Sequence, residues 1–279
     1  MCGIIGFTGR KPAKDILIDG LERLEYRGYD SAGIALLNDD DTLTIRKKAG
    51  RVSELRELCK DGDYSSTCGI GHTRWATHGG VTDANAHPHR CGNVALIHNG
   101  IIENYSDIIR EYGLADKLVS ETDSEVVAAL LDTLYDGDPI AAIRKAVKII
   151  AGSFALCIMF ADRPGIIYAV RNVSPMVAAH SEEGSIIASD LTAIISFSKD
   201  YFVVPEYHIL TMTQEGIRVE DLKGNEVKPQ MLEITWDITA AQKGGFPHFM
   251  LKEIYEQPES LRNTITPRIV NSLPDFCLL

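Results

Sequence analysis

The chain of 279 residues is 45% hydrophobic and 24% charged, which allows a large apolar core and differs from the composition of disordered proteins. Its formal net charge of −11, from 28 basic and 39 acidic residues with no run of Lys or Arg, argues against nucleic acid or a membrane as a partner. Because the sequence has no secretory signal, no apolar stretch near the roughly 18 residues of a membrane span and only irregularly spaced cysteines, we expect a soluble cytoplasmic protein with reduced thiols.

The first part of the chain contains several predicted strands and one helix. "GIIGF" (residues 3–7) is a short apolar run that ends in turn residues, which is typical of a strand. Residues 12–26 begin with a proline and carry apolar side chains at helical spacing, which predicts a helix. The other predicted strands of this part are residues 32–37, 42–48, 67–72 and 93–98, the last two framing a polar loop.

The second part begins with two predicted helices. Thr122 stands three residues before Glu125, a capping-box spacing that starts the first helix, and Pro139 opens the second. From residue 153 to about residue 220, apolar runs alternate with turn residues, which indicates strands, with a short helix near residues 191–195. Because strands and helices are grouped rather than alternating, we expect an α+β fold of stacked layers.

A separate segment is predicted at the end of the chain. A Gly-Gly pair at residues 244–245 precedes the helical pattern "FMLKEIYEQPESLRNTI". We therefore place a boundary near residue 240, which divides the chain into a domain of residues 1–240 and an appendage of residues 241–279.

Cys2 raises the question of what a cysteine does directly after the start methionine. A cysteine near a terminus is usually a small apolar residue. If the methionine is removed, however, Cys2 carries a thiol and an α-amine whose reference pKa is roughly 7.7–8.0, suitable for a general base. One residue then supplies both a nucleophile and its base.

The stretch "GHTRWATHGGVTDANAHPH" (residues 71–89) contains candidate binding residues. Arg74 offers a planar guanidinium that suits a carboxylate, Trp75 could wall a pocket, and Thr77 can form local hydrogen bonds; the alternative is a solvated polar loop. Possible metal ligands also gather here, but their spacings match no compact zinc pattern, so we predict no metal site. These possible ligands are Cys68, His72, His78, His87, His89 and Cys91.

Two further positions are candidates for function. Asn99-Gly100 ends an apolar run; the pair is a common turn, yet a side-chain amide beside a glycine N–H also offers two donors to an oxyanion. Asp123 lies in the first turn of a predicted helix, where an acidic residue is favoured for structural reasons alone. No glycine-rich phosphate loop occurs, so no nucleotide or other cofactor is expected.

Seven segments occurring in order resemble the glutamine amidotransferases that use an N-terminal cysteine, and most closely the amide-transfer half of the glutamine–fructose-6-phosphate aminotransferases. The resemblance extends from Cys2 to about Thr264. The segments are "CGIIG", "LEYRGYDSAGIA", "GHTRWATHG", "NAHPH", "HNGIIENY", "SETDSEV" and "KEIYEQP". The resemblance implies an N-terminal-nucleophile hydrolase fold, a four-layer αββα sandwich with two antiparallel sheets.

The resemblance also implies roles for the candidate residues. Cys2 would attack the side-chain amide of L-glutamine, while Asn99 and Gly100 hold the oxyanion. Arg74 and Asp123 would bind the α-carboxylate and α-ammonium groups of the substrate. Trp75, Thr77 and His78 would lie on a loop that closes over glutamine, and Arg27 would support the terminus. Ammonia would pass to a sugar-phosphate isomerase half that accepts it on fructose-6-phosphate.

Two departures from the family and two alternatives remain. Val173 and Pro267 stand where the family pattern has glycine, and the isomerase half is missing from this sequence, so we expect the domain alone to be a monomer. One alternative is a non-catalytic sensor that binds glutamine, or the amidotransferase half of another acceptor system. The other is a hydrolase of a different amide. The pairing of Arg74 with Asp123 argues against it, because together they suit the head group of an α-amino acid.

Overall fold

The computed structural model describes residues 2–38, 40–62, 64–235, 246, 248–266, 269–270 and 273–274. The chain divides into two compact units, Met1–Ile234 and Thr235–Leu279. The boundary predicted between residues 240 and 241, and Pro267, lie outside the described residues.

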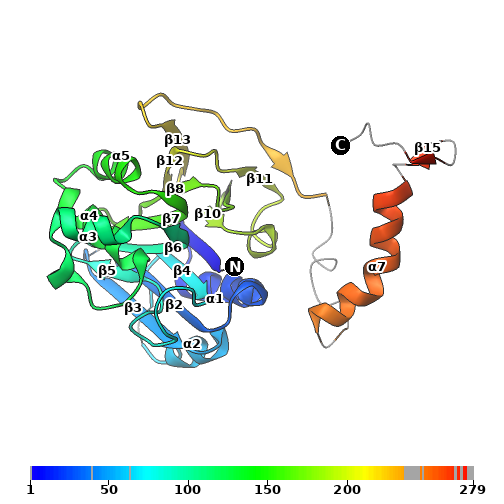
Figure 1. Cartoon of the computed structure of the whole chain (residues 1–279), viewed down its shortest axis with the longest axis horizontal. Coiled ribbons are helices and arrows are strands. Elements are labelled where there is room, and N and C mark those ends of the chain that lie inside the picture. The colour runs from blue at the N-terminus through cyan, green and yellow to red at the C-terminus, as the bar shows by residue number, and fades with distance from the viewer. Residues whose placement is uncertain are drawn as a thin grey trace. The chain divides into compact units, whose positions relative to one another are not determined.

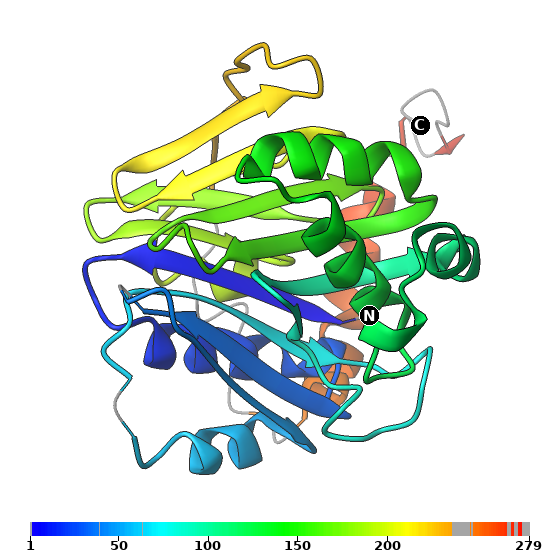
Figure 2. The same cartoon turned by 90° about the vertical axis from the view of Figure 1, so that its left-hand side faces the viewer.

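The first unit is a four-layer sandwich of two antiparallel sheets between helices (Figures 1 and 2). Helices α1 (Ala13–Leu24) and α2 (Val52–Leu58) cover the outer face of one sheet. Helices α3 (Tyr105–Tyr112), α4 (Asp123–Leu134) and α5 (Pro139–Ile149) cover the other. The predicted layers are confirmed.

Within the described residues, the two sheets of this unit contain eight and six strands. In spatial order the larger sheet is β14 (Leu232–Glu233), β11 (Asp200–Val203), β9 (Val177–Ser181), β10 (Gly184–Ala188), β1 (Gly3–Gly9), β4 (Cys68–Arg74), β2 (Ser31–Leu37) and β3 (Leu43–Ala49). The smaller is β13 (Gly216–Asp221), β12 (His208–Thr213), β8 (Ile167–Asn172), β7 (Gly152–Phe160), β6 (Val94–Ile102) and β5 (His89–Cys91). Short 3₁₀ turns are η1 (Glu25–Arg27), η2 (Ala115–Lys117) and η3 (Leu191–Ala193).

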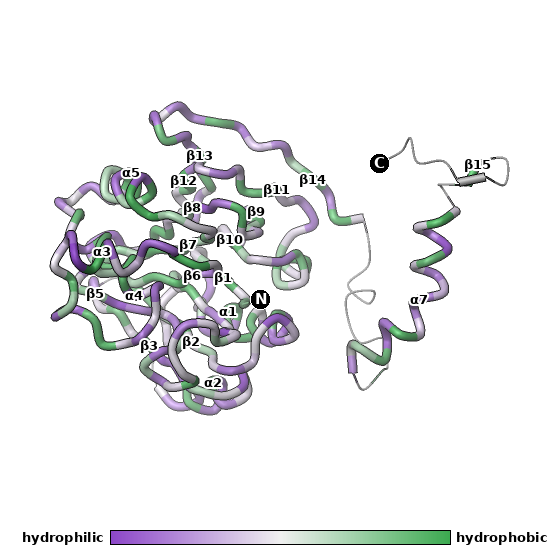
Figure 3. The backbone as a smooth tube through the Cα atoms, viewed as in Figure 1, coloured by the Kyte–Doolittle hydropathy of each residue, from purple (hydrophilic) through white to green (hydrophobic). Residues whose placement is uncertain are grey.

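Both faces of the central strands are buried, which explains their nearly continuous apolar sequences. Successive side chains of a strand point to opposite faces. In β1, Ile4 therefore packs between the sheets, while Ile5 and Phe7 pack against the helical layer of α1. In β6, the side chain of Ile97 lies between the sheets and that of Leu96 lies toward α3–α5. The hydropathy colouring in Figure 3 shows these strands as apolar segments.

The capping signal before α4 is confirmed in part. The Thr122 hydroxyl accepts a hydrogen bond from the Glu125 N–H, with the two atoms 3.2 Å apart. The Glu125 carboxylate does not return to Thr122 as in a full capping box. It accepts instead from the N–H groups of Val119 and Ser120, and so fixes the loop before the helix.

Helices α2 and α3 were not predicted from the sequence. They have 7 and 8 residues, too few turns for a clear 3.6-residue apolar period. Only Val52 and Leu55 of α2, and Ile108 of α3, are fully buried. Both helices depend on tertiary packing rather than on a strong local signal.

Val173, one of the departures from the family pattern, occupies a strained backbone position. Its φ angle is +65°, in the left-handed region, and its side chain is 67% exposed. A β-branched residue there costs about 1–2 kcal/mol relative to the usual backbone regions. The turn is retained because Glu206 accepts hydrogen bonds from the Val173 N–H and from Arg171.

We expect Val173→Gly to stabilise the first unit by about 1 kcal/mol, because glycine adopts this φ without steric strain. Urea-induced unfolding would measure the change. The matched control is Val203→Gly, at an exposed position in β11 with strand geometry, where glycine should lower the free energy of unfolding. Equal destabilisation by both substitutions would contradict the strain argument.

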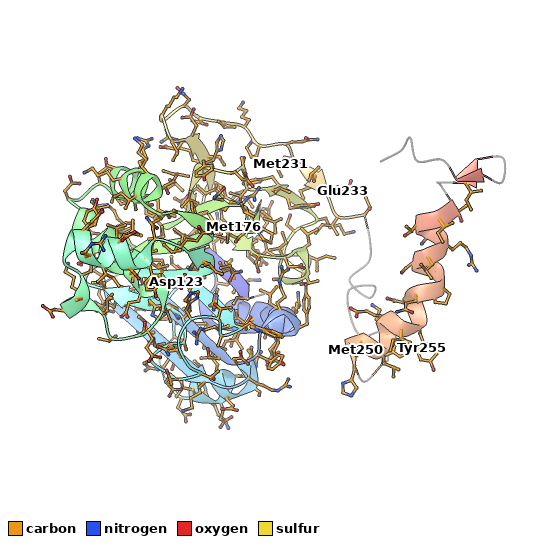
Figure 4. The ribbon with its side chains drawn as sticks, in the orientation of Figure 1. Asp123, Met176, Met231, Glu233, Met250 and Tyr255 are labelled. Carbon is orange, nitrogen blue, oxygen red and sulfur yellow. The ribbon has the colours of Figure 1, made fainter. Side chains whose placement is uncertain are left out.

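The described part of the second unit contains α7 (Phe249–Ile265) and a pair of two-residue strands, β15 (Ile269–Val270) and β16 (Leu273–Pro274). The helix predicted from "FMLKEIYEQPESLRNTI" is confirmed. Figure 4 labels Met250 and Tyr255 on it. Across the described ranges, no helix combines the length and the apolar character needed to span a bilayer.

Candidate active site

Cys2 lies where the start of β1 meets the end of β4. The register of these antiparallel strands pairs Gly3 with Thr73, so that Cys2 comes beside Arg74, the last residue of β4. The next residue, Trp75, donates its backbone N–H to the Cys2 Sγ, with the two atoms 3.1 Å apart. The thiol is therefore fixed at one edge of the sandwich.

The environment of the Cys2 thiol keeps it protonated at neutral pH. Burial raises its pKa above the ordinary value, and Asp30 adds to the rise. The hydrogen bond from Trp75 and the charge of Arg74 oppose the rise without cancelling it. A nucleophilic attack by this thiol consequently requires a general base.

Asn99 reaches Cys2 from the other sheet, and Gly100 follows it on β6. The Asn99 Nδ2 donates a hydrogen bond to the backbone carbonyl of Cys2, with the atoms 3.0 Å apart. Gly100 has a φ of +135°, and a Cβ at this position would lie 2.0 Å from the carbonyl oxygen of Ser153 on β7. Only glycine fits there. The Asn-Gly pair therefore lies within strand β6 rather than in a turn, and the close contact with β7 explains its glycine.

Asp123, the first residue of α4, is a buried acid at the same end of the sandwich. It is 5% exposed, and its carboxylate accepts hydrogen bonds from the Ile102 N–H and the Ser124 hydroxyl. Figure 4 labels it in the first unit. Among the residues that the structure describes, no cationic side chain forms an ion pair with it. A buried carboxylate without such a partner is suited to a cationic ligand.

Arg74 organises the loop that follows β4. Its terminal nitrogens donate to the backbone carbonyls of His78, Gly79 and Gly80, the last with the atoms 3.0 Å apart. The Gly80 N–H in turn donates to Glu121. The structure thus assigns Arg74 bonds to its own loop, a role that the sequence did not indicate; binding of a carboxylate stays a prediction.

The three remaining candidates of this loop differ in their surroundings. Trp75 is 47% exposed and stacks edge-on against Tyr29, with 5.8 Å between ring centroids. Thr77 is exposed, and His78 is half-buried against the ring of Tyr105. All three lie on the loop after β4, and Trp75 contacts Cys2. Closure of this loop over a substrate stays a prediction.

The "YRGYD" segment (residues 26–30) contacts the backbone at the start of the loop that follows β4. A Cβ on Gly28 would lie 2.8 Å from the carbonyl carbon of Arg74 and 3.0 Å from the Trp75 nitrogen, so the two backbones touch. Asp30 accepts a hydrogen bond from the Ala76 N–H at 2.9 Å. The glycine is required for this close approach.

Arg27 is linked to β1 through an intermediate segment. It forms an ion pair with Asp190 at 2.6 Å and a hydrogen bond to the Ser189 carbonyl. The Ser189 hydroxyl accepts from the Ile4 N–H of β1 at 3.0 Å. Arg27 thus contacts residues 189–190, and Ser189 of this segment in turn contacts β1, the strand that follows Cys2.

Comparison with known proteins identifies the family. A family model described as "Glutamine amidotransferase domain" matches residues 72–196. The chain is 43% identical, over 98% of its length, to glutamine–fructose-6-phosphate aminotransferase [isomerizing] of Clostridium acetobutylicum, and 44% identical, over 96%, to that of Thermus thermophilus. The chain contains a glutamine amidotransferase domain. It spans 45% of the length of these two relatives.

Solved structures agree on the fold of this amidotransferase domain. Glutamine phosphoribosylpyrophosphate amidotransferase from B. subtilis matches with a TM-score of 0.69 and 24% identity, over 81% of this chain and 50% of that one. A glutamine aminotransferase class-II domain protein from Silicibacter pomeroyi matches with a TM-score of 0.56 and 16% identity, over 79% of this chain and 99% of that one. The N-terminal-nucleophile hydrolase fold is confirmed.

The histidines of the amidotransferase domain form a stacked, buried cluster. The rings of His72 and His87 stack with centroids 4.1 Å apart, and His89 meets His87 edge-on at 4.5 Å. His98 contacts this cluster through its backbone N–H, which donates to the His87 Nδ1. Within the described ranges, no group of three or more His, Cys, Asp or Glu side chains is arranged to hold a metal ion.

We expect this cluster to make the domain sensitive to acid. Burial lowers the pKa of all four rings, that of His72 to about 3, whereas in the unfolded chain a histidine has a pKa of about 6.5. Below about pH 6.5 the unfolded chain therefore binds more protons than the folded one. The free energy of unfolding should therefore decrease as the pH is lowered below about 6.5, by at most about 1.4 kcal/mol per pH unit for each histidine. It should depend little on these groups above about pH 7.5.

Urea unfolding at several pH values between about 5 and 8 measures this slope. His89→Gln, which keeps a polar group for its partner Thr122, should remove the share of one histidine. The exposed His180→Gln is the control and should leave the slope unchanged. A slope that is the same in all three proteins would contradict the assignment.

The contacts of His72 and Ser124 with the candidate residues could not be predicted from the sequence. In the sequence His72 stands out only as a possible metal ligand, yet in the structure it contacts Asn99 across the two sheets. Ser124 donates to Asp123 and bonds to the Nδ1 of His98. No local signal identifies such contacts, since they depend on which strands face each other.

Proposed function

We propose that this domain hydrolyses L-glutamine to L-glutamate and ammonia, with Cys2 as the nucleophile. The observation that carries the proposal is the hydrogen bond between the Asn99 amide and the backbone of Cys2. It holds a strong N–H donor beside the only residue of the site that can form a thioester. A thiol next to a preorganised donor is the arrangement that acyl transfer requires.

In the first step, the Cys2 Sγ attacks the side-chain carbonyl carbon of glutamine. The thiol is protonated at neutral pH, because burial raises its pKa, so its proton must be accepted as the S–C bond forms. After removal of Met1, the α-amine of Cys2 can take this proton and pass it to the leaving nitrogen. The C–N bond then breaks and ammonia departs.

The negative charge on the carbonyl oxygen needs donors during this step. The Asn99 amide and the Gly100 N–H serve as the oxyanion hole in this proposal, a contribution worth about 10²–10³-fold in kcat for one donor. Water then adds to the glutamyl thioester, glutamate leaves, and the thiol recovers its proton from the amine.

The remaining candidates bind the amino-acid head of the substrate. The buried Asp123 carboxylate accepts the α-ammonium group, which supplies a cationic partner that no described residue provides. Arg74 binds the α-carboxylate, and Trp75, Thr77 and His78 close over the substrate as one loop.

We further propose that the ammonia is used for glucosamine-6-phosphate synthesis, as the name of the relatives suggests. Residues 1–240 then form the glutaminase domain, and residues 241–279 lead toward a sugar-phosphate isomerase half that binds fructose-6-phosphate. The proposal includes a cytoplasmic location, a monomeric state for the isolated domain, and no cofactor, nucleic acid or membrane partner.

The test combines turnover with labelling by a diazoketone analogue of L-glutamine. The purified chain should release glutamate and ammonia in equal amounts, and intact mass with peptide mapping should show loss of Met1 and one adduct on Cys2. If the chain has lost Met1 and binds glutamine but shows neither turnover nor labelling, the proposal fails and the protein is a glutamine sensor. Labelling only by analogues of other amides would indicate a different hydrolase.

A further inference from the structure

The side-chain amide of Asn99 is held from two sides. Its Nδ2 lies 3.0 Å from the Cys2 carbonyl oxygen, and its Oδ1 lies 3.0 Å from the Nε2 of His72. A backbone carbonyl can only accept a hydrogen bond, so the amide nitrogen must face Cys2 and the amide oxygen must face His72. His72 is therefore the donor in this contact.

A second acceptor fixes the same proton on His72. The backbone carbonyl of His98 lies 3.0 Å from the His72 Nε2, and it too can only accept. Both contacts require the Nε2–H tautomer. The ring is 1% exposed, and burial lowers its pKa to about 3, so it stays neutral and keeps this tautomer at physiological pH.

We propose that His72 is a positioning residue for the amide-hydrolysing reaction: its Nε2–H fixes the Asn99 side chain so that the amide nitrogen, not the oxygen, points to the reaction centre. The inference rests on the proposed function. The terminal torsion of asparagine is broad and roughly two-fold, so an unrestrained amide can present either atom. With the oxygen turned toward the developing oxyanion, the amide repels the charge that it should stabilise.

The restraint is built into the packing of the site. The His72 ring is stacked on His87, with 15° between the planes, and cannot swing away without breaking that contact. His98, whose carbonyl shares the proton, is the residue directly before Asn99 on β6. One N–H group thus fixes both the side chain of Asn99 and the backbone that carries it.

Two substitutions separate positioning from general structural damage. In His72→Gln the amide nitrogen can occupy the place of Nε2 and still donate, whereas in His72→Asn the shorter side chain places its nitrogen near the position of Nδ1. Both variants lose the ring stacking equally. We expect His72→Asn to lower kcat for glutamine hydrolysis by about 10–100-fold with KM changed less than about threefold, and His72→Gln to remain within about fivefold of wild type.

A double-mutant cycle tests whether His72 acts through Asn99. Asn99→Ala should lower kcat by about 10²–10³-fold. In that background His72→Asn should have less than about a twofold further effect, because the amide it positions is gone. The inference is overturned if His72→Asn lowers kcat by the same factor in both backgrounds, if the Gln and Asn variants are equally impaired, or if the loss lies in KM.

A measurement on the unsubstituted protein decides the case even where His72→Asn does not fold. Histidine ¹⁵N NMR, with the His72 signals assigned from the His72→Gln spectrum, should show a neutral ring protonated at Nε2 between about pH 5 and pH 8. A proton on Nδ1 would overturn the inference. If the unsubstituted chain is neither active nor labelled at Cys2, the proposed function itself has failed; if it is active while the cycle is additive, only the role of His72 is wrong.

Discussion

Replacing Cys2 by alanine should abolish glutamine hydrolysis, with a loss of at least about 10⁴-fold in kcat, while thermal unfolding stays within a few degrees of wild type. The reason is chemical rather than structural. The thiol is the only group at the junction of β1 and β4 proposed to bond covalently to the substrate, and its one strong contact is the Trp75 N–H at 3.1 Å. Release of glutamate, measured by a coupled assay, tests the prediction.

Cys91→Ser is the matched control for this experiment. Cys91 is also partly exposed and free, but it ends β5 and its thiol contacts Asp132. Its replacement should leave both turnover and labelling by the diazoketone analogue unchanged. Turnover that survives in Cys2→Ala would refute the nucleophile assignment, and labelling of Cys91 would show that the reagent does not report the site.

Asp123→Asn should raise the KM for glutamine by about 10²-fold and change kcat much less. The buried carboxylate forms no ion pair with any described residue, so the α-ammonium group of the substrate would be its charge partner. Loss of one charge from a buried ion pair costs about 2–5 kcal/mol, which corresponds to about 30-fold or more in binding. Asparagine retains an oxygen for the Ile102 N–H, which limits damage to the fold.

Steady-state kinetics on glutamine measures this effect, with urea unfolding to confirm that the variant is folded. Asp107→Asn is the control, because Asp107 also lies in the first turn of a helix, α3, but is exposed and paired with Arg110. An unchanged KM in Asp123→Asn would show that the carboxylate serves only to begin α4. An equal rise in the control would indicate a nonspecific effect of charge.

The sequence predicted the layers of the fold but not how they face each other. Runs such as residues 3–7 and 153–160 are apolar on both sides, which indicates buried strands, and Thr122 marks the start of α4. Nothing in those runs tells which strand lies opposite which, because each strand's hydrogen bonds are the same for any partner. The short helices α2 and α3 were not predicted, because they have too few turns to show an apolar pattern of 3.6-residue period.

The candidate site was predictable as far as local motifs reach. Cys2 is a candidate because of its position at the start of the chain, and Asn99 because it stands beside a glycine at the end of an apolar run. The structure places them within one hydrogen bond of each other. The bonds of Arg74 to its own loop, and the contact of His72 with Asn99, were not found. These pairings join atoms across a loop closure and across two sheets, and no spacing along the chain encodes them.

β1 lies inside the larger sheet, hydrogen-bonded to β10 on one side and β4 on the other. The first residues of the chain therefore cannot be shifted without opening two ladders, and a polypeptide fused ahead of Cys2 would leave the sandwich through the reaction centre. It would also convert the α-amine into an amide. We expect any purification tag at that end to inactivate the protein until a protease restores an N-terminal cysteine. Removal of the tag would then start catalysis at a chosen time, so that the first turnover can be followed.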